Sequence, residues 1–237
     1  MTMQPTPGAK MMYLIRRRSG VSREELIAHW FANHMPGVIR SQELQASAGR
    51  TAARRYIATL FDAQAEPGWD GVAQLWFDAP LPAPAEPHGT RPADSFQERA
   101  EPYVPWATTE YVVLDGELPV TPLTLNPPFP TTRSGFVKAV FLLAAKADAD
   151  HAALYTHWLD VHAPNVTEHM APHGGFRYVI SQSLDPASEP YAGMAELYFR
   201  NAQGWQAFLG ALPDDGLGNY IERAELHLSG TEMIGIP

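Results

Sequence analysis

The sequence contains no cysteine. Disulfide bonds, thiolate nucleophiles and cysteine-ligated zinc or iron–sulfur sites are therefore excluded, and the absence suits a reducing compartment. An apolar stretch long enough to span a bilayer is also lacking, and residues 1–9 lack the apolar core of a signal peptide. We expect a cytoplasmic protein with no membrane partner.

Positive charge is scarce as well. The chain has 17 Lys and Arg against 26 Asp and Glu, a net charge of −9, which argues against nucleic acid as a partner. Phosphate-binding glycine loops and a Gly-x-Ser-x-Gly elbow are missing, so kinase, dehydrogenase and classical hydrolase functions are unsupported. With 237 residues, 45% of them apolar, the chain can form one large domain or two small ones around a small-molecule substrate.

One motif occurs twice, beginning at His29 and again at His157, which is 157 − 29 = 128 residues later. It consists of a His-Trp pair, a second histidine, a proline and a valine: His29, Trp30, His34, Pro36 and Val38 in one copy, and His157, Trp158, His162, Pro164 and Val166 in the other. The tryptophan and the second histidine are four residues apart and share one helix face. Because proline cannot continue a helix, we expect each helix to end here, with the imidazole beside its last carbonyls.

The rest of the chain repeats as well. In the first half, hydrophobic patterning predicts strands at 10–17, 54–61, 71–77 and 109–114, a helix at 22–34 and a short helix at 93–106. In the second half, a strand at 136–144 and a helix follow at the offset of 128, and later matches lie at an offset of 122, as for Gly71–Phe77 and Gly193–Phe199. The sequence therefore predicts a tandem duplication: one repeat at 10–115, a proline-rich linker at 116–135 and a second repeat at 136–237.

A four-stranded sheet with helices on one face leaves its other face bare. Two such units can cover each other, sheet against sheet, and form an eight-stranded barrel-like core with the helices outside. We therefore expect an α+β fold in which both repeats share one barrel, with an interior large enough for a small ligand at most.

The two copies of the Trp-x3-His-x-Pro element, with the later Gly-x-Ala-x-Leu-aromatic-Phe strand, resemble the EthD-like family of the dimeric α/β-barrel superfamily. The resemblance covers roughly residues 10–115 and 136–235. It implies two ferredoxin-like (βαββαβ) repeats that form an intramolecular dimeric α/β barrel. The protein would then be a monomeric pseudo-dimer or a homodimer of barrels.

His34 and His162 are the leading catalytic candidates. A helix C-terminus would favour the imidazolium form, so that each could act as a general acid or base near neutral pH. The alternative is that each imidazole only binds terminal carbonyls of its own helix. The resemblance favours catalysis, because related isomerases and lyases use the matching histidine.

Further candidates recur at matching positions. Tyr56 and Tyr178 could orient a substrate carbonyl if they face the cavity, although a buried aromatic with a satisfied hydroxyl is the simpler interpretation. Arg55 and Arg177, next to them, point to the opposite strand face and are candidates for substrate binding, as are Trp30 and Trp158, which we expect chiefly in the core. Glu110 and Glu232 could assist a histidine but are expected to be solvated.

No metal is expected, because Pro172 disfavours the helix that His169 and His173 would need to chelate one. By analogy with muconolactone isomerases, we expect a cofactor-free isomerase, dehydratase or decarboxylase for oxygenated cyclic, aromatic or polyketide-like compounds. Two alternatives remain open: a monooxygenase, haem-dependent with a histidine as axial ligand or cofactor-free, and a non-catalytic binding protein of a degradation pathway.

Overall fold

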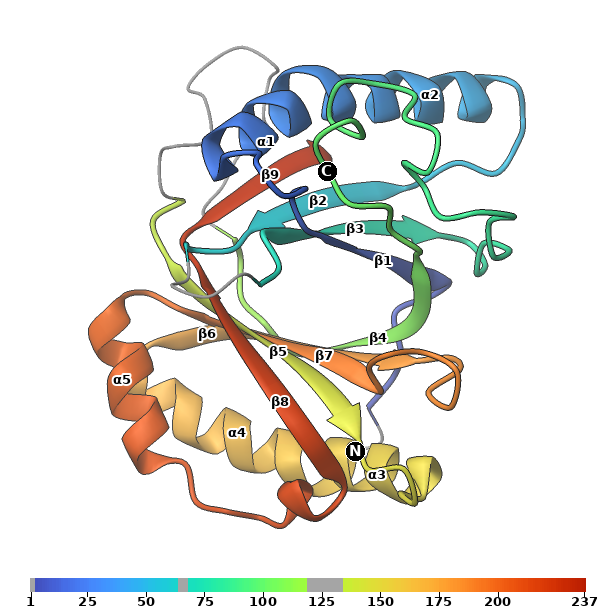
Figure 1. Cartoon of the computed structure of the whole chain (residues 1–237). Coiled ribbons are helices and arrows are strands. Elements are labelled where there is room, and N and C mark those ends of the chain that lie inside the picture. Colours follow the sequence, from blue (N-terminus) through green and yellow to red (C-terminus); the bar gives the residue numbers. More distant parts are fainter. Residues whose placement is uncertain (1–2, 64–67, 119–133) are drawn as a thin grey trace. The chain divides into compact units, whose positions relative to one another are not determined.

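The computed structural model describes residues 3–63, 68–118 and 134–237, which divide into two compact units that interleave along the chain. The first unit contains residues 8–107 and 230–237 with Ser134; the second contains residues 3–7, 108–118 and 135–229. Each unit is an α+β fold in which helices cover one face of an antiparallel sheet (Figure 1). Most of the predicted linker, residues 119–133, lies outside the described residues.

The first unit has four strands and one long, irregular helix. The strands are β1 (Ala9–Ile15), β2 (Arg55–Leu60), β3 (Gly71–Phe77) and β9 (Thr231–Ile236), in the order β1-β3-β2-β9. The helix consists of α1 (Arg23–His29), a π-helical segment η1 (Trp30–His34) and α2 (Met35–Ser47). Ser22 caps α1 by accepting a hydrogen bond from the Glu25 amide, as its capping-box sequence predicts.

The second unit has five strands and two groups of helices, one at residues 151–173 and one at residues 202–219. The strands are β4 (Trp106–Asp115, in this unit from Thr108), β5 (Val137–Ala145), β6 (Gly175–Ser183), β7 (Gly193–Phe199) and β8 (Ile221–Ser229), in the order β8-β5-β7-β6-β4. The helices are α3 (His151–His157), η2 (Trp158–His162), α4 (Ala163–Met170), η3 (Ala171–His173), α5 (Ala202–Ala211) and η4 (Leu217–Asn219). Among the described residues, no helix combines the length and apolarity needed to cross a membrane.

Each unit takes its edge strand from the other half of the sequence. β4 follows the first half but pairs with β6, through Glu110 opposite Ser181. β9 ends the second half but pairs with β2, through Glu232 opposite Thr59. The strand predicted at 109–114 therefore forms, but it completes the sheet of the second unit instead of closing the first repeat.

The helix predicted at 93–106 is absent from the described chain. Residues 93–105 instead form turns and two isolated bridges, of Ala100 with Arg17 and of Tyr103 with His88. Pro102 and Pro105 lack the amide hydrogens that a helix or a strand ladder would need, which explains the irregular path.

The helices do not end at His34 and His162, so this expectation from the prolines is wrong. Each histidine closes a π-helical segment, and Met35 and Ala163 donate their amide hydrogens to the carbonyls of Trp30 and Trp158, five residues back. The proline then lies in the first turn of the next α-helix, where its missing amide hydrogen costs little.

The recurring Gly-x-Ala-x-Leu strand is explained by its contacts with the helix. Alternation along β7 turns Gly193, Ala195 and Leu197 toward the helices. A Cβ atom on Gly193 would lie 2.8 Å from a ring carbon of Trp158 and would also meet the Ser181 carbonyl oxygen. Glycine is therefore required for the fully buried indole to lie flat against the strand, and Gly71 serves Trp30 in the same way.

We predict that Gly193→Ala destabilises the protein by about 1–3 kcal/mol, because the new methyl group overpacks the Trp158 ring. Chemical denaturation, followed by the loss of circular dichroism, measures the change in unfolding free energy. Gly210→Ala in α5 is the matched control: its Cβ would meet nothing within 4 Å, so it should leave stability unchanged or raise it slightly. Equal unfolding midpoints for wild type and Gly193→Ala would contradict the prediction.

Candidate active sites

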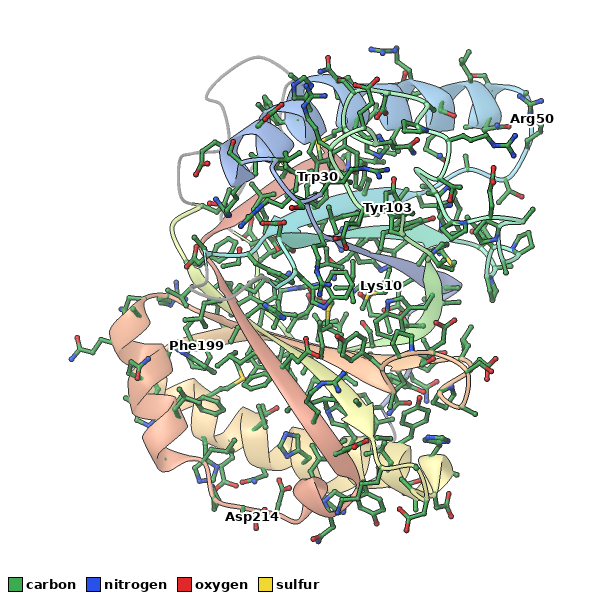
Figure 2. The ribbon with its side chains drawn as sticks, viewed as in Figure 1. Lys10, Trp30, Arg50, Tyr103, Phe199 and Asp214 are labelled. Atoms are coloured by element: carbon green, nitrogen blue, oxygen red, sulfur yellow. The ribbon has the colours of Figure 1, made fainter. Side chains whose placement is uncertain are left out.

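Each unit contains one matching pocket between its helices and its sheet. The volumes are about 360 Å³ in the first unit and about 390 Å³ in the second, within the range for small-molecule ligands. Figure 2 shows Trp30 beneath the helices of the first unit, on the side that faces the sheet. The two linings share these equivalent residues: Trp30 and Trp158, His34 and His162, Val38 and Val166, Tyr56 and Tyr178, Ala73 and Ala195, and Leu75 and Leu197.

A tryptophan and a tyrosine are joined by a hydrogen bond in each pocket. The Trp30 indole Nε1 donates to the Tyr56 hydroxyl oxygen at 3.1 Å, and Trp158 donates to Tyr178 at 3.3 Å. Indole only donates, so each tyrosine oxygen accepts this bond and its own O–H remains free to donate into the pocket. Burial raises the pKa of both tyrosines far above the ordinary value, so both hydroxyls keep their protons.

A histidine and an aspartate form the second shared pair. His34 Nδ1 lies 2.6 Å from Asp94 Oδ2, and His162 Nδ1 lies 2.8 Å from Asp215 Oδ2. A carboxylate accepts a hydrogen bond from Nδ1–H, which fixes the tautomer that leaves the Nε2 lone pair unprotonated. Each pocket therefore presents an oriented imidazole whose Nε2 can take up a proton.

The aspartates are themselves held in place. Asp94 accepts a hydrogen bond from the backbone N–H of Gln97 at 2.9 Å, and Asp215 accepts one from the side-chain amide of Asn165 at 2.7 Å. Burial alone would raise the pKa of each aspartate, but these bonds and the neighbouring histidine outweigh it and hold the pKa below the ordinary value. Both groups are therefore carboxylates at neutral pH.

The electrostatics of His162 differ from what its sequence position suggested. The helix continues past His162, so no helix C-terminus stabilises an imidazolium there. Burial lowers the pKa of His162 below 6.5, and the attraction of Asp215 offsets this only in part. His162 is neutral near pH 7 and is poised to act as a base.

Several predicted site residues lie elsewhere. Arg55 stacks over the Trp76 ring and Arg177 pairs with Asp115, and neither lines either of the two matching pockets. Glu110 and Glu232 were expected to be solvated, which is wrong. They are buried and accept hydrogen bonds from Thr6 and Thr59 within their own units.

The first histidine of each motif copy, and His169, contact polar groups within their own units. His29 Nδ1 lies 2.8 Å from the Ser95 hydroxyl, and His157 Nε2 lies 3.7 Å from Asp215. His169 contacts the Asn165 carbonyl of its own helix. Across residues 3–63, 68–118 and 134–237, no three His, Asp or Glu side chains are arranged to hold a metal ion.

The sequence analysis did not identify the two aspartates. A Pro-x-Asp signal was present in both halves, at Pro92 and Pro213, and 213 − 92 = 121 nearly matches the repeat offset. This signal lies in loops, which have no hydrophobic periodicity by which the two halves could be matched. His88, which lines the first pocket from the proline-rich segment, was also missed.

Comparisons with known proteins agree with the predicted resemblance. Residues 146–211 match the EthD domain family, which confirms the resemblance in the stretch that contains His162. A protein from Fusobacterium nucleatum, provisionally described as a monooxygenase, has 7% identity and a TM-score of 0.51, with coverage of 99% of this chain and 95% of that one. At such low identity the likeness shows a shared fold alone.

Two further solved structures are more distant. A haem-binding protein from Thermus thermophilus has 11% identity and a TM-score of 0.43, covering 97% of this chain and 93% of that one. Chlorite dismutase from Candidatus Nitrospira defluvii, in complex with imidazole, has 7% identity and a TM-score of 0.49, with 94% and 91% covered. No curated protein matches the chain in sequence.

We predict that the His162 imidazole titrates below pH 6.5, and that Asp215→Asn lowers its pKa further, because the carboxylate is the group that favours the charged ring. Nuclear magnetic resonance of the histidine ring protons across a pH series measures both values, with His162→Gln assigning the signal. An increase in the pKa in Asp215→Asn would contradict the arrangement described.

Proposed function

We propose that both pockets are cofactor-independent acid/base sites that act on small oxygenated ring compounds through an enol or enolate. One observation carries this proposal. In each pocket, a histidine oriented by a carboxylate and a tyrosine with a free hydroxyl proton line the same apolar cavity. The substrate class would include cyclic ketones, lactones and aromatic or polyketide-like compounds.

The histidine performs the proton transfer. Its Nε2 takes a proton from the carbon next to the substrate carbonyl, and the C–H electron pair becomes the C=C bond of the enolate. The aspartate stabilises the imidazolium that forms. Return of the proton to a different carbon isomerises the substrate. In dehydration the enolate expels a β-hydroxyl group, which leaves as water after protonation, whereas in decarboxylation loss of CO2 itself forms the enolate and the histidine returns a proton to carbon.

The tyrosine stabilises the developing charge. Tyr56 or Tyr178 donates its hydroxyl hydrogen to the carbonyl oxygen, and the tryptophan hydrogen bond holds the phenol oxygen in position. A donor that is already oriented in a low-dielectric pocket stabilises an oxyanion more strongly than water does. Because its pKa is raised, the tyrosine stays protonated and remains a donor.

A haem-dependent function fits these pockets poorly. Haem has two carboxylates, and burying a carboxylate without a cationic partner is costly. The linings contain no Lys or Arg among the described residues, and the charged residues of the second pocket are Asp214 and Asp215. We therefore assign no step to haem.

We propose in addition that the two halves are ferredoxin-like repeats that form a barrel within one chain. The symmetrical exchange of β4 and β9 supports this arrangement, because β4 pairs with the second strand of one repeat and β9 with the second strand of the other. The order β8-β5-β7-β6 is that of a ferredoxin-like sheet.

We predict that the protein accelerates the exchange of the α-protons of 2-tetralone for deuterium, measured by nuclear magnetic resonance in D₂O. Loss of a general base should slow exchange at its site by about 10²–10⁴-fold. The variant His34→Gln/His162→Gln should therefore lose nearly all of the acceleration, and each single variant should keep the contribution of the other pocket. In His34→Gln, exchange should decline as the pH falls through the lowered pKa of His162, because protonation removes the base.

His151→Gln, at the start of α3 and outside the linings of both pockets, is the matched control and should exchange at the wild-type rate. A double variant that exchanges as fast as wild type would contradict the assignment of the bases. A wild-type protein that binds 2-tetralone without accelerating exchange would support the non-catalytic binding protein instead.

A further inference from the structure

The two pockets differ sharply in the residues that line them besides the shared pairs. The first pocket has additional polar groups, and these are Tyr13, Gln42, Gln45, Thr51, His88, Gln97 and Tyr103. In the second pocket the additional residues are mostly apolar, with Phe141, Leu143, Phe208, Leu209, Leu212, Leu217 and Ile221, and its additional polar side chains are Asp214 and Asp215. The volumes are nearly the same, so the difference is one of chemistry and not of size.

Tyr13 and Phe141 occupy equivalent positions and show this difference in polarity most directly. Tyr13 in β1 lies opposite Ala73, and Phe141 in β5 lies opposite Ala195, so the two aromatic residues are equivalent in register. The first pocket thus has a hydroxyl group where the second has a ring hydrogen. The Tyr13 hydroxyl makes no hydrogen bond to any described residue, although its ring is largely buried between His88 and Tyr103. A hydroxyl that lines a pocket without a protein partner can donate its hydrogen to a ligand.

The groups around Tyr13 form a second polar site. The Tyr13 and His88 ring centres are 6.0 Å apart, and those of His88 and Tyr103 are 5.6 Å apart. Gln97 donates from its side chain to the Tyr103 hydroxyl at 3.4 Å. Burial raises the pKa of Tyr13 to about 12, so its hydroxyl is a donor throughout the neutral range.

We infer that the two pockets bind different ligands. The first takes a ring compound with two oxygen substituents, one held by Tyr56 and His34 and the other by Tyr13 and His88. The second takes a ring compound with a single oxygen substituent, held by Tyr178 and His162, and an apolar remainder against Phe141. This assignment rests on the proposed function for the position of the first oxygen and adds the chemistry that binds a second one.

Two probes of nearly equal size test the assignment: 2-naphthol, with one hydroxyl group, and naphthalene-2,7-diol, with one hydroxyl group on each ring. The indole N–H signals of Trp30 and Trp158 report on the two pockets separately, because each indole N–H donates a hydrogen bond to the tyrosine that a ligand would contact. In ¹⁵N-labelled full-length protein, Trp30→Phe and Trp158→Phe identify these two among the six tryptophan signals.

The diol should shift the Trp30 signal at a lower concentration than the Trp158 signal, and 2-naphthol should show the reverse order. Tyr13→Phe should weaken binding of the diol at the Trp30 pocket by about five-fold, the size of one hydrogen bond, and leave the Trp158 titration unchanged as an internal control. Phe141→Tyr, the matched exchange, should strengthen binding of the diol at the Trp158 pocket.

The assignment is overturned if both probes rank the two signals alike, if Tyr13→Phe has no effect, or if neither probe shifts either signal. These binding results do not depend on turnover. Equal binding of both probes with intact deuterium exchange would reject the ligand assignment alone. Selective binding with exchange unaffected in His34→Gln/His162→Gln would reject the acid/base function alone.

Discussion

A proline inside each long helix is the constraint on which the rest of the structure depends. Pro36 and Pro164 donate no backbone hydrogen bond, and in a regular α-helix their rings would collide with the preceding turn. The helix remains continuous because it widens into a π-helical segment just before each proline. That segment contains the tryptophan and the histidine, so the same adjustment that accommodates the proline brings both side chains over the sheet.

The sheet has space for the tryptophan side chain of the helix. A glycine leaves space for the flat indole, and the alanine and leucine that alternate with it form the floor of the pocket. The indole then fixes the tyrosine of the neighbouring strand through its N–H. A loop residue far along the chain, Asp215, completes the site by orienting His162. The helix thus contributes the tryptophan and the histidine, the strand contributes the tyrosine and the loop contributes the aspartate.

Most residues of this site can be predicted from the sequence, but the way in which they are assembled cannot. Strand periodicity located the strands well, because alternation depends only on which faces are buried, and the duplication identified Trp30, His34 and Tyr56 through their partners. The exchange of β4 and β9 could not be predicted, since a strand shows the same alternation in either sheet. Asp94 was missed because it is 60 residues from His34 in a loop. The continued helix was missed because proline usually ends one.

The strand exchange also has a consequence for the history of the gene. A simple duplication can normally be reversed, because either copy can be deleted once the other suffices. Here each compact unit takes its edge strand, β4 or β9, from the other copy, so deleting one copy would leave the remaining sheet with an unpaired edge. Neither half of the sequence therefore contains a complete compact unit, and both halves must be present for either sheet to keep all of its strands.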